Sequence, residues 1–228
     1  ATTEIYSLSL HDALPISDTG RYEGKICECA IRLREELLYS DSSFVCKGQQ
    51  FSLSTETDEE NNKAIEICRR FADAYPSTQI LNIIIFGAVA TGKTFLAGSI
   101  CNRLAERGLS FCALTAFGLA RDFLNEHTSP TAHRTGLSEL TDAPLLVIDD
   151  LGSEPFYNNV SREYLFALLD ERAVGKRGTV VTTNLSLAEL CERYGERVFS
   201  RLADKSKGIF INLKGSDKRL NNKQGGRQ

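Results

Sequence analysis

Two patterns of apolar and polar residues succeed each other along this chain. Continuous apolar runs indicate strands, and an apolar residue every three or four positions indicates helices. Residues 80–86 (ILNIIIF) are almost continuously apolar and stop at Gly87. Such a run is typical of a strand that is buried on both faces of a parallel sheet. The same reasoning predicts four further strands, at 110–115, 144–149, 179–183 and 209–213.

Helical periodicity fills the intervals between these runs. In residues 62–75 apolar side chains recur three and four positions apart, and Pro76 ends the pattern. Similar patterns predict helices at 94–106, 117–126, 161–173 and 187–194. Because strands alternate with helices, we expect an α/β fold with a doubly wound, five-stranded, mostly parallel sheet.

Composition narrows the class of protein. The 228 residues carry a formal charge of −3, with 25% charged and 42% hydrophobic residues, which suits one globular domain with a small appendage. No apolar run approaches the roughly 18 residues that a membrane span needs. The near-neutral balance excludes a protein that coats nucleic acid by bulk charge. We therefore expect a cytoplasmic protein with no membrane partner, whose seven cysteines are reduced thiols.

The first part of the chain divides into three polar segments before the main domain. Residues 1–16 lack any periodic pattern and resemble a translated sequencing adapter, which fits the absence of Met and marks a probable artefact. A natural, irregular arm is the alternative. Residues 17–50 form a truncated N-terminal segment, residues 51–62 (FSLSTETDEENN) an acidic linker, and residues 63–228 the main domain.

The strongest chemical signal follows the first strand. Residues 87–94 (GAVATGKT) match the G-x-x-x-x-G-K-[ST] phosphate loop, with a strand before and a helix after. Gly87 and Gly92 let backbone N–H groups point at a phosphate chain, which the helix dipole also favours. Lys93 supplies a charge for the β and γ phosphates, and Thr94 offers a hydroxyl to Mg²⁺. An accidental match is the alternative, and the flanking strand and helix argue against it.

Two carboxylates end the strand at 144–149. Asp149 and Asp150 follow LLVI directly, at the sheet edge where ligands of α/β proteins bind. Asp149 is expected to hold Mg²⁺, directly or through water, and Asp150 to orient or polarise the attacking water. Strands often end in a turn with Asp, so this signal is weak by itself and becomes strong beside a phosphate loop.

Two further polar positions each allow two interpretations. Asn184 ends a strand that can lie beside the first one, where it would sense the γ-phosphate. The alternative is a helix N-cap or a turn residue before the next helix, for which Ser186 is an equally suitable cap. Arg197 and Arg201 share one helical face. Either is suited to reach the phosphates of a neighbouring subunit, or both are ordinary surface arginines in solvent or ion pairs.

Taken in this order, the motifs resemble those of AAA+ ATPases of the DnaC/DnaI/IstB group, the bacterial replicative helicase loaders and related transposition helpers. The resemblance covers residues 18–219, is closest to loader-like proteins of clostridial type, and implies a P-loop NTPase (AAA+/ASCE) three-layer sandwich with little or no C-terminal lid. It rests on GAVATGKT (87–94), LLVIDDLGSE (145–154), VVTTNLS (180–186), YGERVFSRL (194–202) and GSDKR (215–219).

The resemblance also implies a role for each matching position. Catalytic positions are Asp150, where many AAA+ proteins have Glu, Glu154 as an alternative polarising group, Asn184 as first sensor, and Arg197 or Arg201 as arginine finger. The metal positions, for Mg²⁺, are Thr94 and Asp149. Positions that bind ATP are Gly87, Ala88, Val89, Ala90, Thr91, Gly92, Lys93, Thr94, Phe95 and, as second sensor, Arg219. The shorter Asp150 suggests slow hydrolysis.

Related chains often carry a zinc module of C-x-x-C, Asp-Thr-Gly and C-x-C in their N-terminal part. Here Asp18-Thr-Gly20 and Cys27-Glu-Cys29 are present, and the first cysteine pair would fall within residues 1–16. Two thiolates do not close a tetrahedral zinc site. The site of Cys27 and Cys29 is therefore expected to be incomplete, with Zn²⁺ bound only by the untruncated parent.

The implied partners are the hexameric replicative DNA helicase, single-stranded DNA, and further copies of the chain through the arginine finger. Candidate DNA contacts are Arg121, His127, Arg134 and the tail 205–228, which holds seven basic residues and one acidic residue. Three alternatives stay open: an IstB-like transposition helper on duplex DNA, a small-molecule P-loop kinase, and a non-catalytic nucleotide-binding scaffold. The zinc-module remnant favours the loader.

Overall fold

The computed structural model describes residues 21–22, 25–26, 49–54, 58–128, 135–204 and 208–215. The chain divides into two compact units, residues 1–37 and 38–228. In the first unit, β1 (Arg21–Tyr22) and β2 (Lys25–Ile26) form a short antiparallel pair. Cys27 and Cys29 lie outside the described residues, so the zinc module stays a prediction.

A five-stranded sheet forms the centre of the second unit. Its strands lie in the order β4 (Phe111–Thr115), β5 (Leu145–Asp149), β6 (Gly178–Thr183), β3 (Asn82–Gly87) and β7 (Gly208–Leu213). Every pairing is parallel. Each predicted strand agrees with an observed one to within two residues, and the sheet is wholly rather than mostly parallel.

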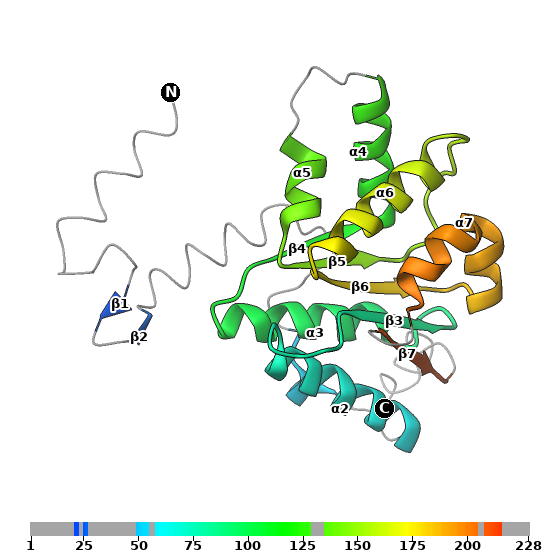
Figure 1. Cartoon of the computed structure of the whole chain (residues 1–228). Helices are drawn as coiled ribbons and strands as arrows, with labels where there is room; N and C mark the ends of the chain where they lie inside the picture. Colours follow the sequence, from blue (N-terminus) through cyan, green and yellow to red (C-terminus); the bar gives the residue numbers. More distant parts are fainter. Residues whose placement is uncertain are drawn as a thin grey trace, which may run out of the picture. The chain divides into compact units, whose positions relative to one another are not determined.

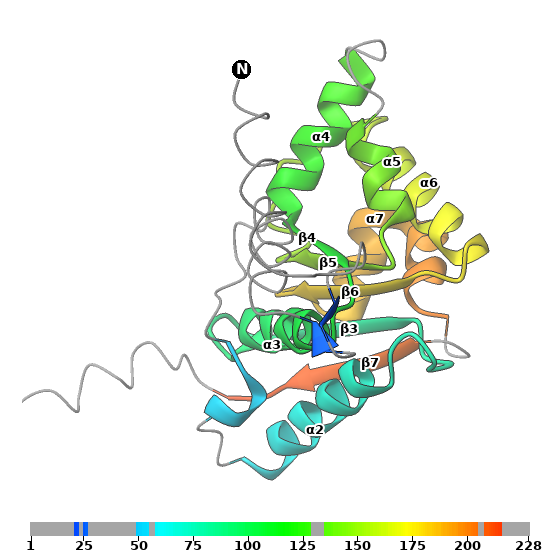
Figure 2. The same ribbon diagram turned by 90° about the vertical axis from the view of Figure 1, so that its left-hand side faces the viewer.

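Helices cover both faces of the sheet and make three layers (Figures 1 and 2). One face carries α2 (Glu59–Ala74) and α3 (Lys93–Glu106). The other carries α4 (Ala116–Thr128), α5 (Thr135–Asp142), α6 (Ser161–Val174) and α7 (Leu187–Leu202). Among the described residues no helix combines the length and apolar character of a membrane span.

Alternation along the central strand explains the two cores. Ile83 and Ile85 point to α2 and α3, whereas Ile84 points to the opposite helices. All three side chains are at most 1% exposed, and full burial of an aliphatic side chain contributes about 1.5–3 kcal/mol. The continuous apolar run thus reflects a strand covered on both faces, as predicted.

Three helices differ from the sequence prediction. The acidic segment expected as a linker supplies the first turn of α2: Asp58 caps the helix by accepting from the N–H of Asn61 at 3.0 Å, and Glu59 and Glu60 follow it. Carboxylates at a helix N-terminus are favourable because of the helix dipole. Helix α5 was not predicted, and α7 continues to Leu202 across a break at Gly195.

Arg172, a buried cation of α6, binds the segment that connects α5 to β5. Arg172 is 1% exposed, and burial lowers the pKa of its guanidinium to about 10, so it stays charged at neutral pH. The guanidinium donates to the carbonyl groups of Leu140, Thr141, Ala143 and Gly178. These bonds satisfy carbonyls at the end of α5, and they connect α5 to α6.

Candidate active site

The loop from β3 to α3 surrounds a buried lysine. Lys93 is 6% exposed, and its Nζ donates to the carbonyl oxygens of Gly87 at 2.9 Å and Ala88 at 2.6 Å. The hydroxyl of Thr91 donates to the same Ala88 carbonyl at 2.9 Å. Burial lowers the pKa of Lys93, and the nearby carboxylates Asp150 and Asp149 oppose that shift.

Two positions in this loop need glycine, and a third carries strain. Gly92 precedes α3 with φ 102°, and a Cβ at Gly87 would lie 2.3 Å from the carbonyl oxygen of Leu213. Ala90 also has a left-handed backbone, with φ 60°, which costs a non-glycine residue about 1–2 kcal/mol. The motif pattern leaves this position free, so the strain at Ala90 could not be read from the sequence.

Asp149 lies at the end of β5 and is bound by two hydroxyl groups. Thr94 of α3 donates to its two oxygens at 3.0 and 3.1 Å, and Thr182 of β6 donates to Oδ1 at 2.6 Å. The carboxylate is 6% exposed; burial raises its pKa, and the two hydroxyl groups oppose that rise. Thr182 was missed in the sequence, because threonine is common in strands.

Asp150 and Asn184 meet beside this pair. The Nδ2 of Asn184 donates to Oδ1 of Asp150 at 2.6 Å, and the N–H of Asp150 donates to the Thr182 hydroxyl at 2.8 Å. Ser186, not Asn184, caps α7, in a capping box with Glu189. Asn184 is therefore not the cap of α7; it lies in the bend between β6 and α7, and its role as a sensor stays a prediction.

The residues present suit a magnesium nucleotide. Thr94 and Asp149 supply adjacent hydroxyl and carboxylate oxygens, the ligands that Mg²⁺ prefers together with phosphate oxygens and water. The desolvated carboxylate gains from a nearby cation, and the N-terminus of α3 favours an anion. Among the described residues there is no group of three or more His, Cys, Asp or Glu side chains placed to hold a metal, so a cation here would depend on the phosphates as well.

Comparison with known proteins identifies the family. Residues 52–224, about three quarters of the chain, match the family described as IstB-like ATP binding protein. The chain belongs to this family. Its AAA+ type of P-loop fold, predicted from the motifs, is thereby confirmed together with its ATP-binding character.

Individual proteins that are similar to this chain agree with this assignment. The replicative helicase loader DnaC of Escherichia coli strain K12 is 28% identical over 173 residues, which are 75% of this chain and 64% of DnaC. The chain thus spans just under two thirds of the length of that relative. A crystal structure of DnaI shares the fold, with 23% identity and a TM-score of 0.63 over 76% of this chain and 92% of DnaI. DnaA from Aquifex aeolicus with bound AMPPCP also shares it, with 19% identity and a TM-score of 0.63 over 82% and 57% of the two chains.

Glu154 lies apart from the phosphate loop. It is 6% exposed, its Oε2 accepts from the N–H of Gly152 at 2.8 Å, and its Oε1 accepts from the hydroxyl of Tyr194. Its backbone carbonyl accepts from Arg193 at 2.6 Å. Because both carboxylate oxygens already have donors, Glu154 is poorly suited to polarise water, and Asp150 is the better candidate.

Arg197 and Arg201 lie on the exposed face of α6 and α7. The guanidinium carbon of Arg197 is 4.0 Å from the ring centroid of Phe166, and the Nε of Arg201 is 2.6 Å from the carboxylate of Asp170. Both contacts are with side chains of α6. The role of either arginine as a finger toward a neighbouring copy stays a prediction.

The remaining candidates are spread over several elements. Val89 is 58% exposed in the phosphate loop, and Phe95, in the first turn of α3, is partly buried against the core. Arg121 is exposed on α4 beside Asp122, and the His127 ring lies 6.0 Å from that of Tyr164. Arg134, Arg219 and most of the basic tail lie outside the described residues.

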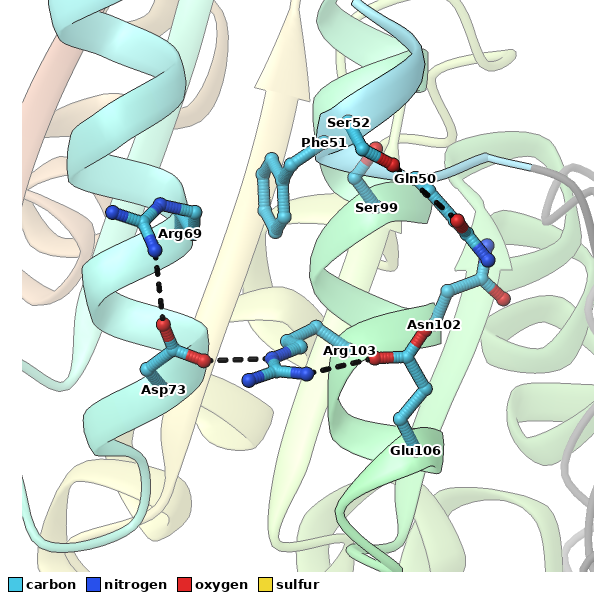
Figure 3. A pocket seen from close by; sticks show the side chains of 9 residues that line it. All are labelled: Gln50, Phe51, Ser52, Arg69, Asp73, Ser99, Asn102, Arg103 and Glu106. Atoms are coloured by element: carbon cyan, nitrogen blue, oxygen red, sulfur yellow. Dashed lines mark hydrogen bonds and ion pairs between the residues drawn. The ribbon is translucent and has the colours of Figure 1, made fainter.

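A hollow of about 210 Å³ lies away from the phosphate loop, between α2, α3 and the 3₁₀ turn Phe51–Leu53 (Figure 3). It is near the C-terminal half of α3, at the opposite end of the helix from Lys93. Its charged groups already pair: Arg103 binds Asp73 at 2.7 Å and Glu106 at 2.9 Å. With its charges matched, this hollow offers no free cation to a phosphate, and we do not assign the nucleotide to it.

Proposed function

We propose that this chain binds ATP with Mg²⁺ at the β3–α3 loop and hydrolyses it. The observation that carries the proposal is the contact of Thr94 with Asp149 directly beside the buried Lys93. A hydroxyl, a carboxylate and an ammonium group converge there at the N-terminus of a helix. This combination suits a triphosphate and a divalent cation, and it suits few other ligands.

Binding is the work of three groups in this chain. Lys93 exchanges the carbonyls of Gly87 and Ala88 for the β and γ phosphates, which are stronger acceptors because they are charged. The N–H groups at the start of α3 bind the same phosphates. Thr94 and Asp149 would hold Mg²⁺, whose charge neutralises the phosphate oxygens as the γ-phosphoryl group is transferred.

Hydrolysis is assigned to Asp150 and Asn184. Asp150 accepts a hydrogen bond from water and orients it toward the γ-phosphorus, and Asn184 fixes the carboxylate in place. A new bond forms between the water oxygen and phosphorus, the bond to the β–γ bridging oxygen breaks, and ADP and phosphate leave. The proton of the water passes to Asp150 and then to solvent. Arg197 of a neighbouring copy stabilises the negative charge on the phosphoryl oxygens in the transition state.

In its biological role, the chain loads or remodels a replicative hexameric DNA helicase on single-stranded DNA. The similarity to proteins named replicative helicase loader DnaC supports this role. ATP and ADP states then select different assemblies, which suits a slow ATPase. A role as an ATP-dependent transposition helper is the second candidate, favoured by the name of the matching family, IstB-like ATP binding protein.

One experiment separates the two roles. The chain is mixed with the hexameric helicase of its host, with and without ATP and Mg²⁺, and the mixture is run on a sizing column with multi-angle light scattering. The loader predicts a complex whose amount depends on ATP and on single-stranded DNA. Binding to duplex DNA together with no helicase complex would favour the transposition helper. The Lys93→Ala variant is the control for ATP dependence in both cases.

A further inference from the structure

Three residues from distant parts of the chain meet below the nucleotide edge. Glu154 follows the turn after β5, while Arg193 and Tyr194 lie in α7. We refer to these three residues as the Glu154 latch. Glu154 and Tyr194 are 6% and 3% exposed. The pKa of Tyr194 is raised by burial and by the Glu154 carboxylate, so its hydroxyl stays a proton donor at neutral pH.

The carboxylate of Glu154 connects the turn to the helix. One oxygen accepts from the N–H of Gly152 at 2.8 Å, two residues after Asp150, and the other accepts from the Tyr194 hydroxyl. Ser153 closes the turn by donating from its hydroxyl to the carbonyl of Asp150 at 2.8 Å. A movement of the Asp150 turn would therefore strain the buried hydrogen bond between Glu154 and the Tyr194 hydroxyl of α7.

Helix α7 breaks directly after the latch. Gly195 has φ 85° and ψ 162°, which no helix contains. The carbonyls that this break frees, those of Glu192 and Arg193, accept from the guanidinium of Arg162 at 3.1 and 2.8 Å. Arg197 lies two residues beyond the break, on the second half of α7. The break, with these two carbonyls satisfied, thus lies between the latch and the arginine, and we refer to it as the hinge because the proposal below requires it to bend.

We propose that the Glu154 latch positions Arg197 according to the nucleotide bound in the same chain. The proposal rests on the proposed function, because it needs ATP at Asp150 and a finger at Arg197. An unpaired carboxylate or hydroxyl is costly when buried, so the Asp150 turn and the Tyr194 end of the hinge must move together. Glu154, Arg193 and Tyr194 are positioning residues in this scheme, and they do not touch the phosphates.

The test measures hydrogen exchange of residues 195–202 with and without AMP-PCP and Mg²⁺. In the unchanged chain the analogue should slow exchange in this segment. The Tyr194→Phe variant should bind the analogue within about twofold and lose most of that slowing, because the hydroxyl that connects the two elements is gone. A Tyr194→Phe chain that keeps the full slowing would overturn the latch.

Two further variants serve as a matched control and as a second way to break the latch. Tyr164→Phe, which makes the same chemical change in α6 where the ring packs on Phe123, should keep the nucleotide-dependent slowing. Glu154→Leu keeps a side chain of similar size but removes both acceptors, those for the N–H of Gly152 and for the Tyr194 hydroxyl. It should lose the slowing as Tyr194→Phe does, and it serves if Tyr194→Phe does not fold.

A mixing experiment tests the connection to the finger. Tyr194→Phe alone should hydrolyse ATP about tenfold more slowly than the unchanged chain in its assembled form. Added Asp150→Asn subunits, inactive themselves but with an intact finger, should raise the rate above that of either variant alone. No rise would mean that the substitution damages its own nucleotide site, which overturns the proposal. A failure of the unchanged chain to bind AMP-PCP would refute the proposed function first, and the latch with it.

Discussion

The nucleotide edge of the sheet and the arginine face of α6 and α7 use charge in opposite ways. At the edge, Lys93 and Asp149 are each 6% exposed and hydrogen-bonded within the chain. On the face, Arg197 and Arg201 are exposed and contact an aromatic ring and a surface carboxylate. The described groups of the proposed nucleotide site all belong to one chain, whereas the proposed catalytic role of the face needs a second copy.

This difference separates two kinds of variant. A change at the edge should act on the isolated chain, because the groups that bind the phosphates are already assembled there. A change on the face should act only when subunits meet, because exposed arginines in solvent contribute little to the stability of their own chain.

The largest effect on nucleotide binding is expected for Lys93→Ala. Lys93 offers two hydrogen bonds that turn from carbonyls to phosphates. At about 1.5 kcal/mol for each charge-assisted bond, nucleotide affinity should fall by about 100-fold or more. The measurement is a titration with a fluorescent ATP analogue. Lys63→Ala, in the exposed ion pair with Glu59 on α2, should leave the affinity unchanged; unchanged affinity in Lys93→Ala would move the nucleotide elsewhere.

Arg197→Ala should have no effect on the isolated chain and a large effect in the assembly. Affinity for the analogue should stay within about twofold, while hydrolysis in concentrated, assembled protein should fall toward the rate of the dilute chain. Arginines supplied in trans raise the rate of phosphoryl transfer by about 10³-fold or more. The rate is followed by phosphate release as a function of protein concentration.

Arg201→Ala is the matched control for that comparison. Arg201 is held by Asp170 at 2.6 Å, so its loss removes a surface ion pair worth at most about 1 kcal/mol. If Arg201→Ala lost the concentration-dependent rate and Arg197→Ala kept it, the assignment of the finger would be reversed.

Asp150→Asn should lower hydrolysis by about 100-fold with unchanged nucleotide affinity, because a group that orients and accepts a proton from water typically contributes 10²–10⁴-fold. Single-turnover hydrolysis measures this at a protein concentration where the assembly is complete. Glu154→Gln should cost no more than about tenfold under the same conditions, since Glu154 acts through Tyr194. The opposite order would return the water-polarising role to Glu154.

The sequence predicted the elements that form the edge, but it did not predict the contacts that connect the edge to the face. The strand 82–87, the phosphate loop and the acids after β5 follow from an apolar run and a motif, which are local. Helix α5 was missed because it spans only eight residues, which is shorter than the window over which a helical period can be recognised. The latch joins Glu154 to a tyrosine 40 positions away, and no local pattern reports such a contact.

The roles at the edge were also only partly readable. Asn184 could be a sensor or a helix cap from its position alone, and the capping box of Ser186 with Glu189 decides against the cap. Thr182 reads as an ordinary strand residue, although its hydroxyl joins Asp149 to the backbone of Asp150. A hydroxyl in a strand carries no sign of its partners until the register of β5 and β6 is known.

The smallest expected effect concerns strain, which the described residues show at the edge in Ala90 and Asp150 with φ 60° and 59°. Ala90→Gly removes a left-handed alanine, worth about 1–2 kcal/mol, and adds about 0.4–1 kcal/mol of unfolded-state entropy. The free energy of unfolding should therefore rise by about 0.5–1 kcal/mol. Ala88→Gly, at a position without positive φ, should lower it. Urea unfolding of both variants measures the difference, and equal shifts would mean that the loop stores no strain at Ala90.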